Sequence, residues 1–171
     1  MKKHIIISGF LSLLLVVLIL IVALFPFREL TKKTDYKEAK STSVKLYEKR
    51  EKEFHSARDA LEKNLSADDI KIAGVEEIFM DNGTDNYTRI ICFCIGTQGL
   101  TGGQYWGLYY TSNDKPADPF GLKEEFQNGP YAESYYYSKP DEHIFYATEK
   151  IEEYWYFYYM DYDGNRHGLD W

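Results

Sequence analysis

Cysteine is scarce in this chain, which has only Cys92 and Cys94 among its 171 residues. The two residues are two positions apart, so in an extended strand their side chains share one face but lie too far apart for a bond. This spacing excludes a disulfide between them. We expect both thiols to be small, buried, apolar groups.

Basic residues are also scarce beyond residue 41. Residues 42–171 hold 13 Lys and Arg against 24 Asp and Glu, a net charge of −11, whereas residues 1–41 hold 7 against 3, a net charge of +4. A domain this acidic repels a phosphate backbone, so counterion release cannot drive its binding to nucleic acid. We therefore expect no nucleic-acid partner.

The sequence also lacks recognisable catalytic and metal-binding motifs. The glycines at positions 96, 99, 102 and 103 have neither dinucleotide-binding nor phosphate-loop spacing. Asp161, Asp163 and Asn165 alternate as in a calcium loop, but Arg166 stands where such a loop needs glycine. A turn at Asp163-Gly164 explains this spacing without a metal. We assign no catalytic, cofactor-binding or metal-binding residue, and no cofactor is indicated.

A run of 23 residues without a charged side chain, residues 5–27, follows a tail of residues 1–4. At 1.5 Å per residue, roughly 20 of them cross a hydrocarbon layer of about 30 Å. A cleaved secretory signal would be shorter and would end at a small-x-small site, whereas this run ends in Ala-Leu-Phe-Pro-Phe-Arg. The run is therefore predicted to be an uncleaved, single-pass signal anchor in membrane lipid.

The sequence has features that favour opposite orientations of this anchor. Two basic residues precede the run and five follow it closely, which favours a cytoplasmic C-terminal domain. Large domains, however, translocate largely regardless of flanking charge, and a basic tip before a long apolar run is typical of secretory targeting. We expect a cell-membrane protein with its C-terminal domain outside the cytoplasm.

The polar residues 28–43 are predicted to form a juxtamembrane stalk or an extension of the following helix. From Val44 to Leu61, apolar residues recur at spacings of three, four and seven, with charged residues between them. This period predicts an amphipathic helix over 44–64 and a globular domain over 44–171. The helix is expected to pack on a sheet; the alternative is a helix that binds a membrane surface or a partner.

Alternating apolar and polar residues after Ser66 predict about six strands. The second strand is apolar on both faces, so it should be central and covered by the helix on one side. Short connections favour antiparallel pairing. The predicted fold class is α+β: a transmembrane helix, then an amphipathic helix on a mainly antiparallel sheet. The expected strands are Val75–Met80, Tyr87–Ile95, Gln104–Thr111, Tyr131–Tyr137, Ile144–Thr148 and Tyr154–Tyr162, with a long loop over 112–130.

Aromatic residues are abundant, with 16 Tyr, 10 Phe and 3 Trp. Their flat faces and polar rims suit stacking on sugars or binding a protein. Because a strand alternates its sides, half of the run 154–159 must face the core whatever the function is. An exposed aromatic binding surface is the alternative to a core role. Its candidate residues are Tyr105, Trp106, Tyr109, Tyr135, Tyr137, Tyr154, Trp155, Tyr156 and Tyr158.

Two stretches carry a resemblance: Gly107-Leu-Tyr-Tyr-Thr-Ser-Asn-Asp-Lys-Pro and Tyr146-Ala-Thr-Glu-Lys-Ile-Glu-Glu-Tyr-Trp-Tyr-Phe-Tyr. In these, roughly over residues 100–171, the chain resembles uncharacterised small membrane-anchored bacterial proteins with no assigned activity. The resemblance implies an anchored bacterial protein. It transfers no functional residue.

Together these features predict a single-pass membrane protein whose acidic domain binds a protein or an envelope polymer, without catalysis. Two other functions stay open. An envelope hydrolase would bring a glutamate and a partner group together in a cleft, with a perturbed pKa. An accessory subunit would dock onto a larger membrane complex through the helix at 44–64.

Overall fold

The computed structural model describes residues 33–82, 88–98, 103–121, 125–139 and 143–163. Residues 33–171 form one compact unit. The predicted membrane anchor at 5–27 lies outside the described residues. In the part of the chain that is described, no helix has the length and apolar character needed to cross a membrane.

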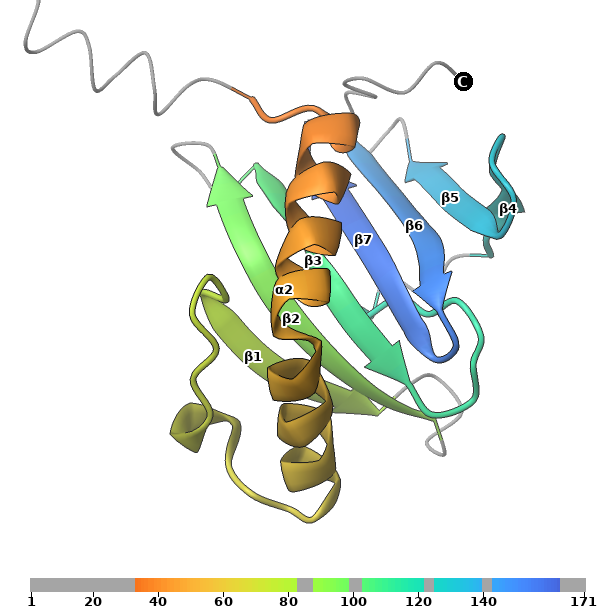
Figure 1. Cartoon of the computed structure of the whole chain (residues 1–171). Helices are drawn as coiled ribbons and strands as arrows, with labels where there is room; N and C mark the ends of the chain where they lie inside the picture. The colour runs from red at the N-terminus through yellow and green to blue at the C-terminus, as the bar shows by residue number, and fades with distance from the viewer. Residues whose placement is uncertain (1–32, 83–87, 99–102, 122–124, 140–142, 164–171) are drawn as a thin grey trace, which may run out of the picture. The chain divides into compact units, whose positions relative to one another are not determined.

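One long helix, α2 (Tyr36–Glu62), packs on a face of a seven-stranded antiparallel sheet, which confirms the α+β fold of the described residues (Figure 1). The strand order is β1-β2-β3-β7-β6-β5-β4. A short 3₁₀ helix, η1 (Ala67–Asp69), follows α2. The strands are β1 (Glu77–Asn82), β2 (Arg89–Gln98), β3 (Gln104–Thr111), β4 (Gln127–Asn128), β5 (Ser134–Lys139), β6 (Ile144–Glu152) and β7 (Trp155–Asp161).

The sheet has one more strand than the sequence predicted. The prediction for β3 matches its bounds, and the other predicted strands overlap β1, β2, β5, β6 and β7. The additional strand, β4, lies within the predicted loop 112–130, where Gln127 and Asn128 pair with Tyr136 and Tyr135. A strand of two residues has no alternation from which it could be predicted.

Helix α2 begins eight residues before the predicted start at residue 44. Asp35 is its N-cap and accepts a hydrogen bond from the Glu38 backbone N–H at 2.8 Å. Tyr36, Ala39 and Ser43 are buried at helical spacing. Residues 36–43 are therefore the first turns of a packed helix, which is the helix extension that the sequence left open beside a stalk.

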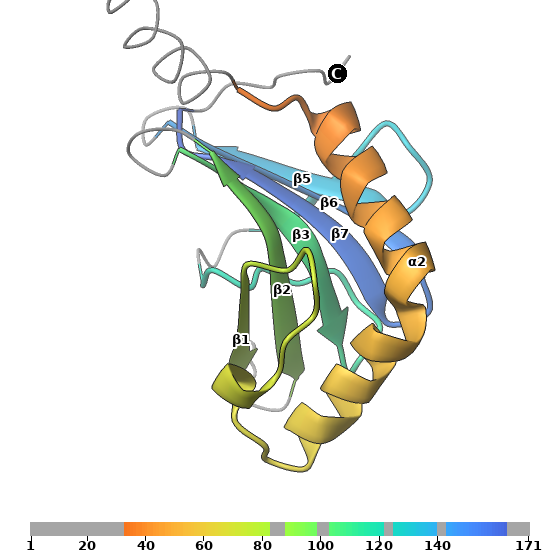
Figure 2. The same cartoon turned by 60° about the vertical axis from the view of Figure 1, so that its left-hand side comes forward.

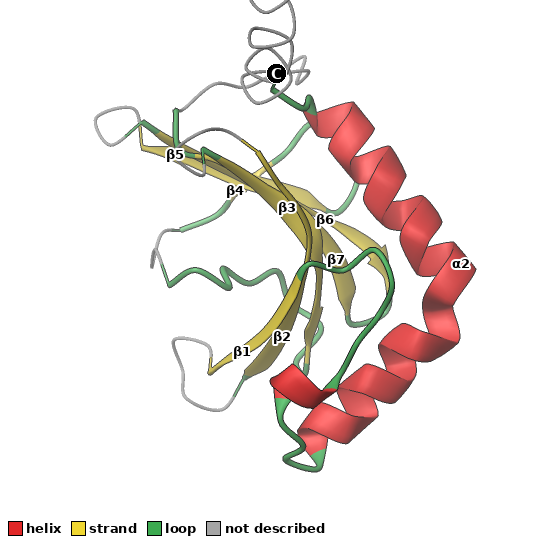
Figure 3. Ribbon diagram, turned by 90° about the vertical axis from the view of Figure 1, so that its left-hand side faces the viewer, coloured by secondary structure: helices red, strands yellow, loops and turns green. Residues whose placement is uncertain are grey.

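Helix α2 bends as it crosses the sheet. Arg50 leaves helical geometry, with φ −126° and ψ 22°. Figures 2 and 3 show the sheet bowing toward α2 and the helix following it. The bend allows both halves to stay in contact with the strands, since Ala39 in the first half and Phe54 in the second are both fully buried.

Aromatic rings form the centre of the core between α2 and the sheet. Trp155 of β7 lies 5.1 Å from Tyr47 and 6.0 Å from Phe54, measured between ring centroids, and both partners belong to α2. On the sheet it lies 5.6 Å from Phe93 and 5.7 Å from Tyr110. Tilted and edge-on contacts of this kind add roughly 0.5–1.5 kcal/mol each beyond the buried area.

The sheet face opposite α2, here called the distal face, has its own buried cluster. Cys92 and Cys94 are buried free thiols, as the sequence predicted, and β2 is a central strand with both faces apolar. Residues 112–121 run across this side of the sheet (Figure 3). The cluster consists of Ile90, Cys92, Tyr109, Tyr137, Ile144, Tyr146, Tyr156, Tyr158 and Met160.

We predict that a fragment spanning 33–171 folds. The unfolding free energy of a fragment spanning 44–171 should be lower than that of the longer fragment by more than about 3 kcal/mol. The shorter fragment lacks three buried positions of α2, among them the large side chain of Tyr36. Urea unfolding followed by tryptophan fluorescence measures the difference. Equal stability of the two fragments would mean that residues 33–43 are a stalk after all.

Candidate functional site

Five of the nine aromatic residues predicted as a binding surface are buried in the core. Strand β7 alternates its side chains between the α2 face and the distal face, and both faces are covered, so the aromatic run 155–159 has no solvent side. These five cannot contribute to a surface, which corrects that part of the prediction. They are Tyr109, Tyr137, Trp155, Tyr156 and Tyr158, each with at most 3% of its surface exposed.

The other four predicted residues do not lie on one surface. Trp106 packs on the α2 side over Gly96, where an added Cβ would come within 2.2 Å of the indole ring. Tyr154 is 37% exposed, just before β7. Tyr135 lies on β5, 6.5 Å from Phe126 between ring centroids. Tyr105 packs against the distal cluster and is partly exposed.

Tyr105 belongs to a different group of partly exposed rings, here called the aromatic patch: Phe79, Tyr105, Phe120 and Tyr162. Phe120 lies 6.0 Å from Phe79 and 6.3 Å from Tyr105, and Tyr105 lies 5.9 Å from Tyr162, between ring centroids. Tyr162 is 40% exposed and the other three are partly exposed. The patch therefore offers connected aromatic area to solvent on the distal side.

Three of the four patch residues were missed by the sequence analysis, because they come from separate segments. Phe79 is in β1, Phe120 in the loop before β4, and Tyr162 directly after β7. Alternation in β1 placed Phe79 on one strand face, but no periodicity relates it to Phe120 or Tyr162. A lone phenylalanine between Pro119 and a glycine was the only local signal.

Carboxylates border the aromatic patch. Asp118 Oδ1 accepts a hydrogen bond from the Phe120 backbone N–H at 2.9 Å, which fixes the turn that presents the ring. Burial, then Tyr105, then Asp118 raise the pKa of Tyr162, so its phenol stays neutral at physiological pH. Glu77 is exposed and stands two positions before Phe79 in β1, hence on the same strand face.

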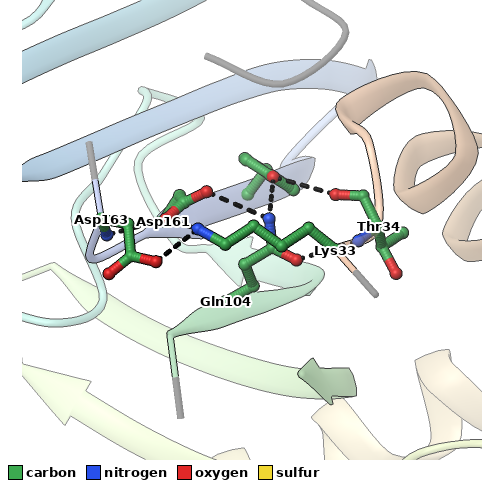
Figure 4. A network of polar contacts seen from close by, with 6 residues as sticks. Lys33, Thr34, Gln104, Asp161 and Asp163 are labelled. Carbon is green, nitrogen blue, oxygen red and sulfur yellow. Dashed lines mark hydrogen bonds and ion pairs between the residues drawn. The ribbon is translucent and has the colours of Figure 1, made fainter. Parts of the chain in front are cut away.

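A second group of polar side chains, the Asp161 network, lies where β7 ends (Figure 4). The carboxylate of Asp161 is fully buried and accepts hydrogen bonds from Gln104 Nε2 at 3.0 Å and from the Asp163 backbone N–H at 2.7 Å. Lys33 Nζ lies 3.6 Å from Asp161 Oδ1 and also pairs with Asp163. The two carboxylates of the calcium-like spacing thus face a lysine.

The same network fixes the first described residues to three strands. The Thr34 backbone N–H donates to Gln104 Oε1 at 3.0 Å, and Tyr159 donates to the Thr34 carbonyl at 3.0 Å. The Thr34 hydroxyl also donates to Gln98. These bonds position the start of α2 on β2, β3 and β7, so the Asp161 network has a structural role. Within the described ranges, no group of three or more His, Cys, Asp or Glu could hold a metal ion.

A third polar cluster joins the bend of α2 to the end of β6. Tyr47 donates a hydrogen bond to Glu152, and its oxygen lies 3.2 Å from His55 Nε2. His55 Nε2 is also 3.6 Å from Glu152 and 3.9 Å from Glu51. Burial and the contact with Glu152 raise the pKa of Tyr47, which keeps this phenol protonated. The cluster ties the two elements together.

In this cluster a glutamate lies close to a tyrosine and a histidine. A hydrolase would require such a group of titratable side chains, and it would also require a cleft through which a substrate reaches them. A groove of about 430 Å³ lies nearby, between the second half of α2 and residues 69–72. Its lining includes Ser56, Ala57 and Ile70 but not Tyr47, His55 or Glu152. This groove therefore gives no substrate access to the cluster.

Comparison with known proteins found no matching family model, curated protein or solved structure.

We predict that Gln104→Leu lowers the unfolding free energy by about 2–4 kcal/mol, because the buried Asp161 carboxylate and the Tyr159 hydroxyl lose their shared donor. Gln127→Leu, in the exposed strand β4, should change it by at most about 0.5 kcal/mol. Chemical denaturation of both variants provides the comparison. Equal losses would show that the buried network contributes nothing specific.

We also predict that stability falls as the pH rises above about 9, where the thiols of the unfolded chain ionise, and more steeply above about 10, where its phenols ionise. Burial raises the folded-state pKa of the Cys92 and Cys94 thiols and of the Tyr109, Tyr156 and Tyr158 phenols. Above pH 10 the unfolded chain therefore releases protons that the folded chain retains, which favours unfolding. Urea unfolding at increasing pH, with tyrosinate absorbance, measures the slope.

Phenylalanine variants test the assignment of this slope. Tyr158→Phe should make the alkaline slope shallower, whereas Tyr131→Phe, at a tyrosine that is 42% exposed, should leave it unchanged. An unchanged slope in Tyr158→Phe would contradict the assignment.

Proposed function

We propose that this chain is a single-pass membrane-anchored protein whose domain binds a protein or an envelope polymer outside the cytoplasmic membrane, without catalysis. The observation that carries the anchor is the uncharged run of 23 residues at 5–27. The observation that favours binding is the aromatic patch, whose rings stay partly exposed in a domain that buries most of its other aromatic side chains.

A short connection supports a role close to the bilayer. Only residues 28–32 separate the proposed anchor from Lys33, and a fully extended connection of this length reaches at most about 20 Å. Lys33 forms an ion pair with the sheet and Thr34 a hydrogen bond, so these two residues do not lengthen the flexible connection. A domain on so short a tether would meet partners in or near the membrane surface at high effective concentration.

An accessory subunit that docks through α2 is a second candidate function. The observation in its favour is a set of exposed lysines on the helix, Lys45, Lys49 and Lys52, for which the described residues provide no ion-pair partner. A partner with an acidic surface would fit them.

Site-specific photocrosslinking in intact cells tests the binding surface. A photoreactive side chain at Tyr162 should capture a component of the cell envelope, whereas the same group at Tyr131, which is equally exposed, should not. Capture from position 49 but not from position 162 would favour the accessory subunit and contradict the patch.

Cell fractionation and protease treatment test the anchor and its orientation. The full chain should sediment with membranes, and a chain without residues 5–27 should not. External protease should digest the domain of cells whose wall has been removed. A domain that survives until lysis would place it in the cytoplasm instead.

A further inference from the structure

We infer that the aromatic patch binds a cationic segment of a protein partner, one rich in Lys or Arg. This inference rests on the proposed function and goes beyond it, because it specifies the chemistry of the partner. It is carried by the geometry of four rings and by the charge around them.

The rings of the patch suit a cation because the face of an aromatic ring carries negative potential. A Lys or Arg side chain within about 6 Å of a ring centroid is attracted to it. Phe79, Phe120, Tyr105 and Tyr162 form a continuous series with successive centroids between 5.9 and 6.3 Å apart. Neighbouring rings are inclined to each other by 51° to 82°, so a cation seated in the angle between two of them can contact both.

The central ring of the patch is held in place by the core. Phe120 also packs against Tyr158 at 5.3 Å and Tyr146 at 6.3 Å, between ring centroids, and both of these tyrosines are fully buried. The Phe120 backbone N–H also donates a hydrogen bond to Asp118, which fixes the backbone at this ring. This ring therefore loses little conformational entropy when a partner binds, which favours affinity.

The charge near the patch selects against other ligands. Residues 66–171 hold 19 acidic against 7 basic side chains. Asp118 and Glu77 lie beside the patch, and the nearby Lys33 already pairs with Asp161 and Asp163. An anionic polymer would be repelled by this surface, and a neutral sugar would gain nothing from its charge, whereas a cationic segment is attracted and steered toward it.

Isothermal titration of the full chain in neutral detergent tests this inference. The probe is an octapeptide of alternating lysine and glycine, with an alternating glutamate and glycine octapeptide and a neutral tetrasaccharide as comparison ligands. The lysine peptide should bind, more weakly as salt is raised, and the other two should not. Binding of the glutamate peptide or the sugar in its place would overturn the inference.

Matched variants locate the binding. Tyr162→Ala and Glu77→Gln should each weaken binding of the lysine peptide roughly three- to tenfold. The controls Tyr131→Ala and Glu153→Gln, at exposed positions elsewhere in the sequence, should leave it unchanged. Because all four positions are exposed, the fold should tolerate the changes, and equal thermal midpoints would verify this. Equal weakening by variants and controls would overturn the inference.

The outcome is distinguishable from failure of the proposed function. If Tyr162 captures an envelope component in cells but the lysine peptide does not bind, the surface is right and the cationic partner is wrong. If neither occurs, the proposed function fails as well.

Discussion

The structure depends on the contact between α2 and the aromatic side chains of the sheet, centred on Trp155. A sheet with two apolar faces must have both covered, and α2 is the only long element that the described residues offer for this purpose. Its two halves contribute Tyr47 and Phe54 to the rings around Trp155. Loss of this contact would expose Phe93 and Phe157, both fully buried, to water.

Both ends of α2 are held to the sheet by polar contacts. At the start, the Asp161 network joins Lys33 and Thr34 to the ends of β2, β3 and β7. Near the end, the guanidinium of Arg58 lies 5.3 Å from the ring centroid of Tyr110 in β3. The helix therefore forms one layer of the domain along its whole length, including the turns that directly follow the linker.

The distal face has a different cover, and the candidate site follows from that difference. A loop covers this face where a helix covers the other, and it contributes only a few apolar side chains, of which Phe120 is the largest. Rings at the margin of the loop stay partly exposed. Among the described residues, this lighter cover leaves the rings of the aromatic patch partly exposed.

The sequence predicted those elements that have a clear period. The second half of α2 and strand β3 were found because their apolar residues recur at spacings typical of a helix and a strand. For the first turns of α2 the sequence left a stalk and a helix extension open, because Ala39 and Ser43 are small and a buried serine looks polar in a sequence.

The candidate site could not be predicted in the same way. In the run of aromatic residues after Tyr154, both strand faces are covered, and only the tertiary structure shows this. The patch gathers residues from β1, a loop and the segment after β7, and Lys33 meets a residue 130 positions away. Contacts over such separations leave no local pattern.

Hydrogen exchange of the backbone amides in the full chain tests the central claim, that α2 is part of the folded core from its first turns. The amides of residues 39–47 should exchange as slowly as those of β3 and β7, because they would open only with the whole domain. Exchange of these amides that is orders of magnitude faster than exchange in the sheet would contradict the account.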